Sequence, residues 1–390
     1  MSAAPQQTRG ISQRSRRLPV QAIREVMELA WARPDAIHLE VGEPDFPTPD
    51  NVVEAAARAA REGHTKYTPN AGIPPLREAL AAKVGRVNGY QASPEQIVVS
   101  AGGVEAIHAT LTTLADPGDE VLLPDPAWPD FVQMAALLGT PARFYHQTAE
   151  TGYLPDVAEL EELVNERTRV LIVNSPSNPL GAVIPAARLA ELVEFAERHD
   201  LWLISDECYD EIAFDGDFVS TMAVAPSPRV VSVYSFSKVY AMTGWRIGYA
   251  VAPPEVAAAM TRLQEPLISC VNAPTQMAAL EAVTGPQDVV AKMREAYRER
   301  RDRALEVLRA GGLPVLTPKG AFYLWVDISR AGRRSDAFVR ELIEEHQVAV
   351  APGTAFGAAG DDFVRLSLAS DLDHLLEGSR RLIAQVDSAA

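Results

Sequence analysis

The sequence predicts an α/β fold: a mostly parallel sheet sandwiched by helices, with a smaller α+β domain built from both chain ends. The first observation is that short, β-branched apolar runs alternate with helical segments between residues 96 and 252. Such runs indicate a parallel sheet that is covered on both faces. The second is a separate group of strands and helices after residue 287. We therefore expect 1–45 to be an N-terminal arm and part of the small domain, 46–286 the large domain, and 287–390 the C-terminal small domain.

Composition excludes several classes of protein. The chain has 390 residues, enough for two domains, and a net charge of −16 from 36 basic and 52 acidic residues. This balance argues against nucleic acid and anionic membrane surfaces as partners. The two cysteines, Cys208 and Cys270, form neither a metal site nor a disulfide framework. No apolar run reaches the roughly 20 residues needed to span a bilayer. We expect a cytoplasmic protein with no metal, no nucleic acid and no membrane contact.

The N-terminal region contains helices joined by irregular stretches. Residues 1–17 hold several arginines without a following apolar core, which favours an arm over a secretory signal. Helices are expected over 21–33, 51–62 and 76–88, and a short strand over 38–41. That strand ends at Gly42, which is either part of a domain-crossing linker or a place where a ligand approaches the backbone.

The predicted strands of the large domain each end in a different chemical group. These strands are residues 97–99, 121–123, 170–173, 201–204, 230–234 and 247–251, with 142–145 as a weaker candidate. In such sheets, ligands bind outside the carboxyl ends of the strands. The groups that follow five of these ends are Gly102-Gly103, Trp128, Asn178, Asp206 with Tyr209, and Lys238. Together they would make one ligand site at one edge of the sheet.

Each of these groups also has an ordinary structural interpretation. Gly102-Gly103 could be a simple turn, or could offer backbone N–H groups and a helix N-terminus to a phosphate. Asp206 could cap a helix, or could pair with a pyridine nitrogen. Trp128 could anchor a loop or stack on a ring. Lys238 is one of only five lysines, and it comes just past a buried strand, after Ser235 and Ser237. An amine in that position suits imine formation with an aldehyde.

The C-terminal region predicts the second domain. Prolines 253 and 254 are expected to close the sheet region. Helices are then expected over 276–283, 288–309, 337–346 and 372–386, with strands over 320–326, 348–351 and 363–368. Arg365 lies on the last strand between apolar residues. It could form a surface salt bridge, or its guanidinium could bind a carboxylate through two parallel hydrogen bonds (bidentate binding).

Four segments together resemble the class I/II aminotransferases of pyridoxal-phosphate (PLP) fold type I, in the bacterial branch of the aspartate aminotransferase group. They are residues 174–179, 205–209, 235–238 and 242–249, which occur in the family's order and at its spacing. The resemblance extends from about residue 18 to residue 386. It implies that PLP is the cofactor and that 46–286 is the PLP-binding domain.

The resemblance also implies a role for each motif residue. Lys238, Asp206 and Tyr209 would be catalytic: Lys238 would hold PLP covalently and move a proton, Asp206 would pair with the pyridine nitrogen, and Tyr209 would contact the phenolic oxygen. The cofactor-binding set would further include Gly103, Val104 through its backbone N–H, Trp128, Asn178, Ser235, Ser237 and Arg246. Gly42, Trp128, Asn178 and Arg365 would bind the substrate. Tyr67 would reach the phosphate in the neighbouring subunit, which implies a homodimer with shared sites.

Three departures from the family pattern stand out. Val104 occupies a position where several relatives have a side chain able to reach the phosphate. Leu180 replaces a common threonine, and 239–240 replace a common Thr-Phe pair after the lysine. None of the three touches the expected chemistry, although Tyr240 could alter the pocket.

The expected reaction is transfer of an amino group between an L-amino acid and a 2-oxo acid by a ping-pong mechanism. The alternative on the same site is a PLP-dependent C–S β-lyase, because the cofactor performs the chemistry that the two share. A regulator that merely senses PLP is disfavoured, because few residues precede the first helix and the chain is acidic.

The amino donor is left open by the sequence. Residues 267–276 contain no arginine that could bind a distal carboxylate, although arginines of the arm at 14–20 could do so. Candidates for the side-chain contacts are that arm, Val41, Trp128, Phe356 and the partner's segment 268–272. Alanine, branched or aromatic amino acids are therefore at least as plausible as aspartate, and glutamate with 2-oxoglutarate is a common pair in the family.

Overall fold

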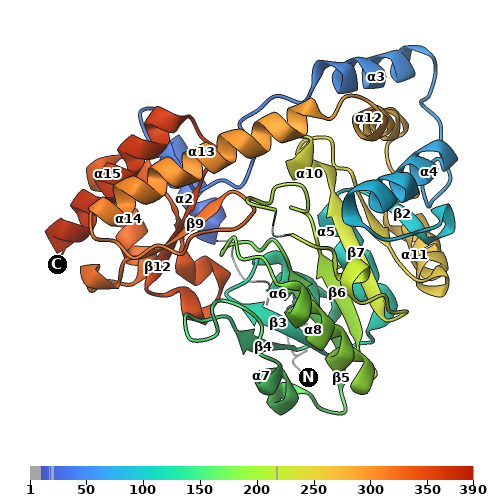
Figure 1. The fold of residues 1–390 in the computed structure, drawn as a ribbon, viewed down its shortest axis with the longest axis horizontal. Helices are drawn as coiled ribbons and strands as arrows, with labels where there is room; N and C mark the ends of the chain where they lie inside the picture. The colour runs from blue at the N-terminus through green and yellow to red at the C-terminus, as the bar shows by residue number, and fades with distance from the viewer. Residues whose placement is uncertain (1–9, 17, 19–21, 217, 390) are drawn as a thin grey trace, which may run out of the picture.

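The computed structural model describes residues 10–16, 18, 22–216 and 218–389, which form a larger and a smaller lobe (Figure 1). The arm expected at the N-terminus therefore lies largely outside the described residues. Within them, the short helix α1 (Gln13–Arg16) precedes the two lobes. None of the described helices is long and apolar enough to cross a membrane.

The larger lobe is built on a seven-stranded sheet with the order β2-β8-β7-β6-β5-β3-β4. Neighbouring strands are parallel except around β8, which runs antiparallel to both β2 and β7. The strands are β2 (Ile97–Ser100), β3 (Glu120–Asp125), β4 (Ala142–His146), β5 (Thr168–Asn174), β6 (Trp202–Asp206), β7 (Val230–Ser235) and β8 (Gly248–Val251). The expected mostly parallel sheet is confirmed, and the weaker candidate at 142–145 is its edge strand.

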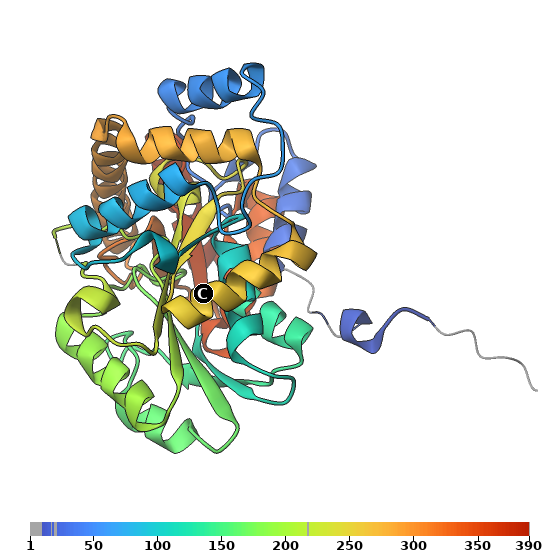
Figure 2. The same ribbon diagram turned by 90° about the vertical axis from the view of Figure 1, so that its right-hand side faces the viewer.

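Helices cover both faces of this sheet (Figure 2). Successive residues of a strand point to opposite faces. Along β5, Val170 and Ile172 pack in a cluster with residues of α5 (Gly103–Leu114), α6 (Asp130–Leu138) and α11 (Pro254–Leu267). Leu171 and Val173 pack in another cluster with residues of α7 (Val157–Leu163) and α8 (Ala186–Arg198). The continuous apolar run in the sequence is explained by this burial on both sides.

A third apolar cluster lies over β2 and β8. It contains buried residues of α3 (Asp50–Arg61), α4 (Pro74–Lys83) and α12 (Ala273–Thr284). Pro74 stands in the first turn of α4, where its missing N–H has no helical partner to lose. The helix then continues as a π-helical turn, Val84–Asn88, and stops at Gly89 with φ of 80°.

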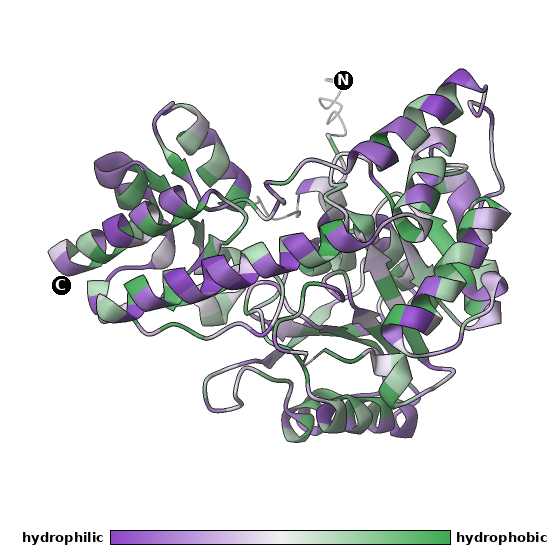
Figure 3. Cartoon of the chain, turned by 45° about the horizontal axis from the view of Figure 1, so that its top comes forward, coloured by the Kyte–Doolittle hydropathy of each residue, from purple (hydrophilic) through white to green (hydrophobic). Residues whose placement is uncertain are grey.

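The smaller lobe joins both ends of the chain. Its strand β1 (Ile37–His38) pairs in parallel with β10 (Val348–Ala349). Beside it, β11 (Ala351–Pro352), β12 (Phe363–Ser367) and β9 (Tyr323–Asp327) form an antiparallel sheet. Its helices are α2 (Ala22–Trp31), α14 (Ser335–His346) and α15 (Leu372–Ala389), and the long α13 (Asp288–Ala310) extends from one lobe to the other (Figure 1). Figure 3 shows hydrophilic and hydrophobic residues alternating along α13, as expected for a helix with one solvated face.

Several elements differ from those expected. The pair Pro253-Pro254 follows the last strand of the sheet, as expected, but it also precedes an unexpected helix: α11 begins at Pro254, because proline is well suited to the first turn of a helix. The strand expected at 38–41 is shorter, since the carbonyls of the next two residues accept hydrogen bonds from groups outside the β1–β10 pair. Leu39 O accepts from Ser367 N at 2.8 Å, and Glu40 O accepts from the Arg365 guanidinium at 2.6 Å.

Candidate active site

A cavity of about 270 Å³ lies at the carboxyl ends of the sheet strands. Twelve residues singled out from the sequence line it: Gly42, Gly103, Val104, Trp128, Asn178, Asp206, Tyr209, Ser235, Ser237, Lys238, Arg246 and Arg365. Tyr67 is not among the lining residues; its side chain is 88% exposed on the surface. Phe356 lies in a neighbouring cavity of about 320 Å³.

Lys238 enters the cavity from α10 (Phe236–Val239), a single helical turn that follows β7 directly. Ser235 stabilises this turn, because its hydroxyl accepts from the Ser237 N–H at 3.2 Å. The Lys238 ammonium donates to Gly42 O at 2.6 Å. Burial lowers the pKa of Lys238 to about 8, since the charged form is poorly solvated there. A buried amine that loses its proton near neutral pH is suited to nucleophilic and proton-transfer chemistry.

One end of the cavity is formed for an anion. Gly102 has φ of 88°, and a Cβ there would lie only 2.7 Å from the Arg246 guanidinium. The glycine thus lets the start of α5 and Arg246 come together. The first N–H groups of α5 have no helical acceptor. With the hydroxyls of Ser235 and Ser237, these donors can hold a phosphate.

Arg246 is itself held in an uncommon conformation. Its φ is 52°, in the left-handed region that non-glycine residues seldom adopt. Its guanidinium donates to Thr243 O at 2.7 Å. This contact fixes the direction of the side chain toward the glycine turn.

Asp206 ends β6 at the floor of the cavity. Its carboxylate accepts from the Cys208 N–H at 3.1 Å. A turn and not a helix follows β6, so the helix-capping role considered for Asp206 is not present. Burial raises the pKa of Asp206 to about 6. A buried carboxylate of this kind gains a strong partner if a protonated ring nitrogen is placed beside it.

Arg365 also lines the cavity. Its guanidinium donates to Asn178 Oδ1 at 2.9 Å and to Glu40 O at 2.6 Å. Its Nε is buried and has no hydrogen-bond partner among the residues that the structure describes. The sequence left open whether Arg365 forms a surface salt bridge; it is 2% exposed and forms none. The geometry of Arg365 instead suits the other role considered for it, the binding of a carboxylate.

Tyr323 is a lining residue that the sequence did not reveal. Its hydroxyl lies 2.8 Å from the hydroxyl of Tyr209, and its ring lies 4.2 Å below the Arg365 guanidinium. A side chain at position 42 would collide with this hydroxyl, which explains a glycine there. On an apolar strand, a tyrosine is hard to distinguish from a core residue, so no sequence signal marked it.

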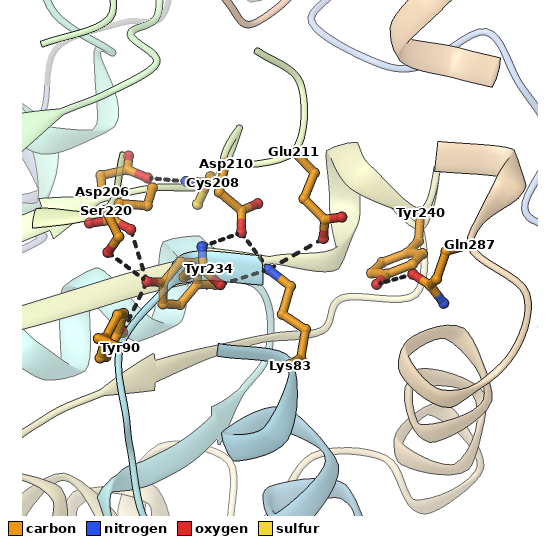
Figure 4. Close-up of polar contacts among 12 residues, drawn as sticks. Lys83, Tyr90, Asp206, Cys208, Asp210, Glu211, Ser220, Tyr234, Tyr240 and Gln287 are labelled. Carbon is orange, nitrogen blue, oxygen red and sulfur yellow. Dashed lines mark hydrogen bonds and ion pairs between the residues drawn. The ribbon is translucent and has the colours of Figure 1, made fainter. Parts of the chain in front are cut away.

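Behind the cavity lies a buried polar cluster, shown in Figure 4, which the sequence also did not reveal. The Lys83 ammonium pairs with Asp210 and lies 3.3 Å from Glu211 and 3.1 Å from Asn88 Oδ1. The neighbouring carboxylates raise the pKa of Lys83 although burial opposes its charge. Because Asp210 follows Tyr209 directly, this cluster fixes the segment that carries Asp206 and Tyr209.

Comparison with known proteins decides the family. The family described as "Aminotransferase class I and II" matches residues 34–378. The chain belongs to the class I and II aminotransferases. An aspartate/prephenate aminotransferase of Thermus thermophilus is 40% identical over 380 residues, which cover 96% of this chain and 98% of that one. An aspartate aminotransferase of Pyrococcus horikoshii is 38% identical, covering 92% and 93%.

Solved structures of aminotransferases show the same fold. The Thermus thermophilus aspartate aminotransferase with maleate superposes with a TM-score of 0.93 at 39% identity, covering 97% of this chain and 100% of the other. An aromatic aminotransferase of Pyrococcus horikoshii gives 0.88 at 36% identity, covering 93% and 99%. The fold is therefore that of PLP fold type I, as expected. The C–S lyase alternative is not favoured, since the relatives are named as aminotransferases.

The aminotransferases of this family depend on PLP and act on amino acids and 2-oxo acids. The donor set of the cavity fits that cofactor. An amine of lowered pKa, a buried carboxylate and an anion-binding end with an arginine are all brought to one space. Trp128, held edge-to-face by Phe131 with ring centroids 5.3 Å apart, supplies an aromatic wall.

Proposed function

We propose that this aminotransferase moves the amino group from an L-amino acid to a 2-oxo acid in two half-reactions, with the cavity residues in the roles that follow. The observation that supports this most strongly is the separation of charges in the cavity. Arg246 lies against the glycine turn at the start of α5, and Arg365 donates to Asn178 and Glu40 O. The positive charges of both arginines act on Lys238, which lines the same cavity as Asp206. This arrangement can orient a phosphate and a substrate carboxylate on either side of one amine.

The cofactor end positions the ring. Gly103 and Val104 through their N–H groups, Ser235, Ser237 and Arg246 would hold the phosphate. Asp206 would bind the pyridinium nitrogen, and Asn178 and Tyr209 would contact the phenolic oxygen. Trp128 would cover the ring. Bound PLP supplies the aldehyde that takes up the amino group and a ring that draws electrons from the substrate Cα.

Arg365 orients the substrate. Its free Nε–H and the groups it now donates to, Asn178 and Glu40 O, surround the place for an α-carboxylate. The backbone at Gly42 closes this place from the other side. Fixing the carboxylate fixes the Cα–H bond, so that the proton to be removed faces Lys238.

Lys238 moves the proton. The buried Lys238 amine, when it is not bonded to the cofactor, has a pKa of about 8, so about half of it is neutral at pH 8 and most of it is neutral above pH 9. The neutral Nζ of Lys238 would accept the proton from the substrate Cα and deliver it to the carbon on the other side of the transferred nitrogen. The same residue would serve both half-reactions in turn, which gives ping-pong kinetics.

We also propose that the active unit is a homodimer with shared sites. Tyr67 is a large aromatic residue that is 88% exposed, outside the cavity of its own chain. A partner subunit would bury it, and its hydroxyl would reach the phosphate of the partner's site. The domains would be divided as the sequence suggested: 46–286 as the PLP-binding domain, with 1–45 and 287–390 in the arm and small domain.

A half-reaction test separates this function from others on the same cofactor. The purified protein, loaded with PLP, is mixed with single amino acids in the absence of a 2-oxo acid. The visible cofactor band should disappear, with one equivalent of 2-oxo acid released for each site. Lys238→Ala should show no such conversion. A band that persists while 2-oxo acid accumulates catalytically would contradict the proposal.

A further inference from the structure

The charged residues of the cavity wall are all accounted for by the cofactor and the α-carboxylate. Among the described lining residues, the charged side chains are Asp206, Lys238, Arg246 and Arg365. Each has a partner in the proposed function: the ring nitrogen, the aldehyde, the phosphate and the substrate carboxylate. Within the described part of the chain, no lining cation is left to bind a second carboxylate on the substrate.

The rest of the wall is largely apolar. Ile23 and Met27 lie four residues apart on α2, so they share one helical face, and that face lines the cavity. Val104 and Ile107 from α5 line the same cavity, together with Val41 and Trp128. Val104 is 38% exposed, which places it at the mouth of the cavity rather than in the core.

The neighbouring cavity also has a largely apolar lining. It shares Ile23 with the first cavity and is lined by Val132, Phe144 and Phe356 among others. Of its described lining residues, the charged one is Asp125, an acid. Its carboxylate accepts from the Ala359 N–H at 3.3 Å, so it is held in place. A negative charge there would repel a second substrate carboxylate rather than bind it.

We infer that the amino donor of this aminotransferase has a neutral, apolar side chain, aliphatic or aromatic, and that aspartate is a poor donor. The inference rests on the proposed function, because it takes the roles of the four charged residues from it. It also separates this chain from the relatives that are named aspartate aminotransferases. The segment 268–272, expected from the partner subunit, contains no charged residue either.

Because its side chain is short, aspartate is the donor that differs most clearly from donors with apolar side chains. Its second carboxylate is one methylene from Cα, so it cannot extend past the apolar wall into water while the α-carboxylate is on Arg365. Burying an unpaired carboxylate is costly, whereas an aliphatic or aromatic side chain gains from leaving water. One methylene group in an apolar pocket already changes selectivity by about 10- to 200-fold.

The test is the rate of the first half-reaction for a series of donors. The PLP-loaded protein is mixed with L-alanine, L-leucine, L-phenylalanine or L-aspartate, and the decay of the visible band gives a second-order rate constant for each. The best neutral donor should exceed aspartate by about tenfold or more. A smaller ratio, or aspartate as the fastest donor, overturns the inference while leaving the aminotransferase function in place. If no amino acid bleaches the band, the proposed function itself fails, and the inference fails with it.

A charge placed in the wall provides a second test. Val104→Lys puts an ammonium at the mouth of the cavity without removing the backbone N–H at that position. The ratio of the aspartate to the leucine rate constant should rise by about tenfold or more. Val53→Lys is the matched control: Val53 is 39% exposed in the first turns of α3, outside both cavities, and its ratio should stay unchanged. An unchanged ratio in Val104→Lys would show that this wall does not meet the donor side chain.

Discussion

The phenol of Tyr323 connects the two groups that would recognise cofactor and substrate. Its hydroxyl pairs with Tyr209, which we place on the cofactor's phenolic oxygen, and its ring lies against Arg365, which we place on the α-carboxylate. If Tyr209 donates to the cofactor, it must accept from Tyr323, because each hydroxyl has one proton. Tyr323 is thus a positioning residue that strengthens Tyr209 as a donor.

Removal of the Tyr323 hydroxyl should therefore change the cofactor's titration. In Tyr323→Phe, Tyr209 becomes a weaker donor, and the deprotonated form of the bound cofactor loses stabilisation. The pKa at which the visible band titrates should rise by up to about one unit, the equivalent of one neutral hydrogen bond. The measurement is a spectrophotometric pH titration of the PLP-loaded protein.

Tyr297→Phe is the control for this titration. Tyr297 is fully buried and packs on Phe322 with ring centroids 5.1 Å apart, but its hydroxyl has no hydrogen-bond partner within the described chain. Its removal should leave the titration unchanged. Equal shifts in the two variants would mean that the effect is one of packing and not of the Tyr209 contact.

The lowered pKa of Lys238 predicts how the cofactor-free protein reacts with pH. The reactive form is the neutral amine, and burial favours it, so its fraction rises as pH increases toward about 8 and is nearly complete above. Acylation of Lys238 by a small amine-specific reagent, followed by peptide mass spectrometry, should accelerate about tenfold per pH unit below 8 and then level off. A rate that still rises tenfold per unit between pH 9 and 10 would contradict this.

At the scale of elements, the turn after β6 is anchored from behind. Asp206 and Tyr209 line the cavity, whereas Glu207 and Asp210 are buried and are not among its described lining residues. Glu207 accepts from Tyr234 at 2.8 Å, and Asp210 pairs with Lys83 at the end of α4. Neighbouring residues of one segment therefore serve the site and the cluster that supports it (Figure 4).

Loss of the Lys83 charge should destabilise the protein strongly. Lys83→Met leaves Asp210 and Glu211 buried without their counter-ion, which should lower the free energy of unfolding by about 3–5 kcal/mol. Urea unfolding at fixed protein concentration measures the change. Lys292→Met, which removes an exposed pair with Asp288 on α13, is the control and should have little effect. A Lys83→Met loss no larger than the control would argue against the anchoring role.

The elements show what could and could not be predicted from sequence. The strands of the large sheet were predictable because burial on both faces leaves unbroken apolar runs, as in Val170–Val173. Their carboxyl ends meet at one edge, so Asp206, Asn178 and Lys238 could be placed in one site. The helix α11 was missed because Pro253-Pro254 was taken as an end and not as a start.

Lys83 and Tyr323 could not be predicted from the sequence, for a different reason. Lysines are mostly exposed, so a lysine in a helix gives no sign of burial. The partner that keeps Lys83 charged, Asp210, is 127 positions away in the chain. Tyr323 likewise meets Tyr209 across 114 positions. The Lys83–Asp210 pair follows from packing within the large lobe, and the Tyr209–Tyr323 pair follows from packing of the two lobes; neither follows from a local pattern.

At the scale of the whole molecule, the small lobe is joined to the large one by more than α13. Phe214 N–H of the large lobe donates to Lys319 O at 2.7 Å, and Ala321 N–H of the small lobe donates to Ile212 O at 2.8 Å. Ala127, beside Trp128, donates to Phe356 O at 2.7 Å. The walls of the cavity from both lobes are therefore held in register.

If two subunits share each site, mixing two inactive or weakened variants should restore activity, which cannot happen if each monomer has a complete site. Lys238→Ala should be inactive, and Tyr67→Phe should bind PLP about tenfold more weakly through loss of one phosphate contact. When the two variants are unfolded together and refolded, mixed dimers contain one site with both native residues. Activity at limiting PLP should then exceed that of either variant alone. No recovery, together with a monomeric mass by sedimentation, would remove the shared-site proposal.

The most direct test of the central claim is to locate the lysine that holds PLP. The PLP-loaded protein is reduced with borohydride, digested and analysed by mass spectrometry. The pyridoxyl group should be found on the peptide that contains Lys238 and should be missing from Lys238→Ala. A reduced adduct on Lys83 or another lysine, or none at all in protein that has retained its cofactor, would contradict the assignment of this cavity as the active site.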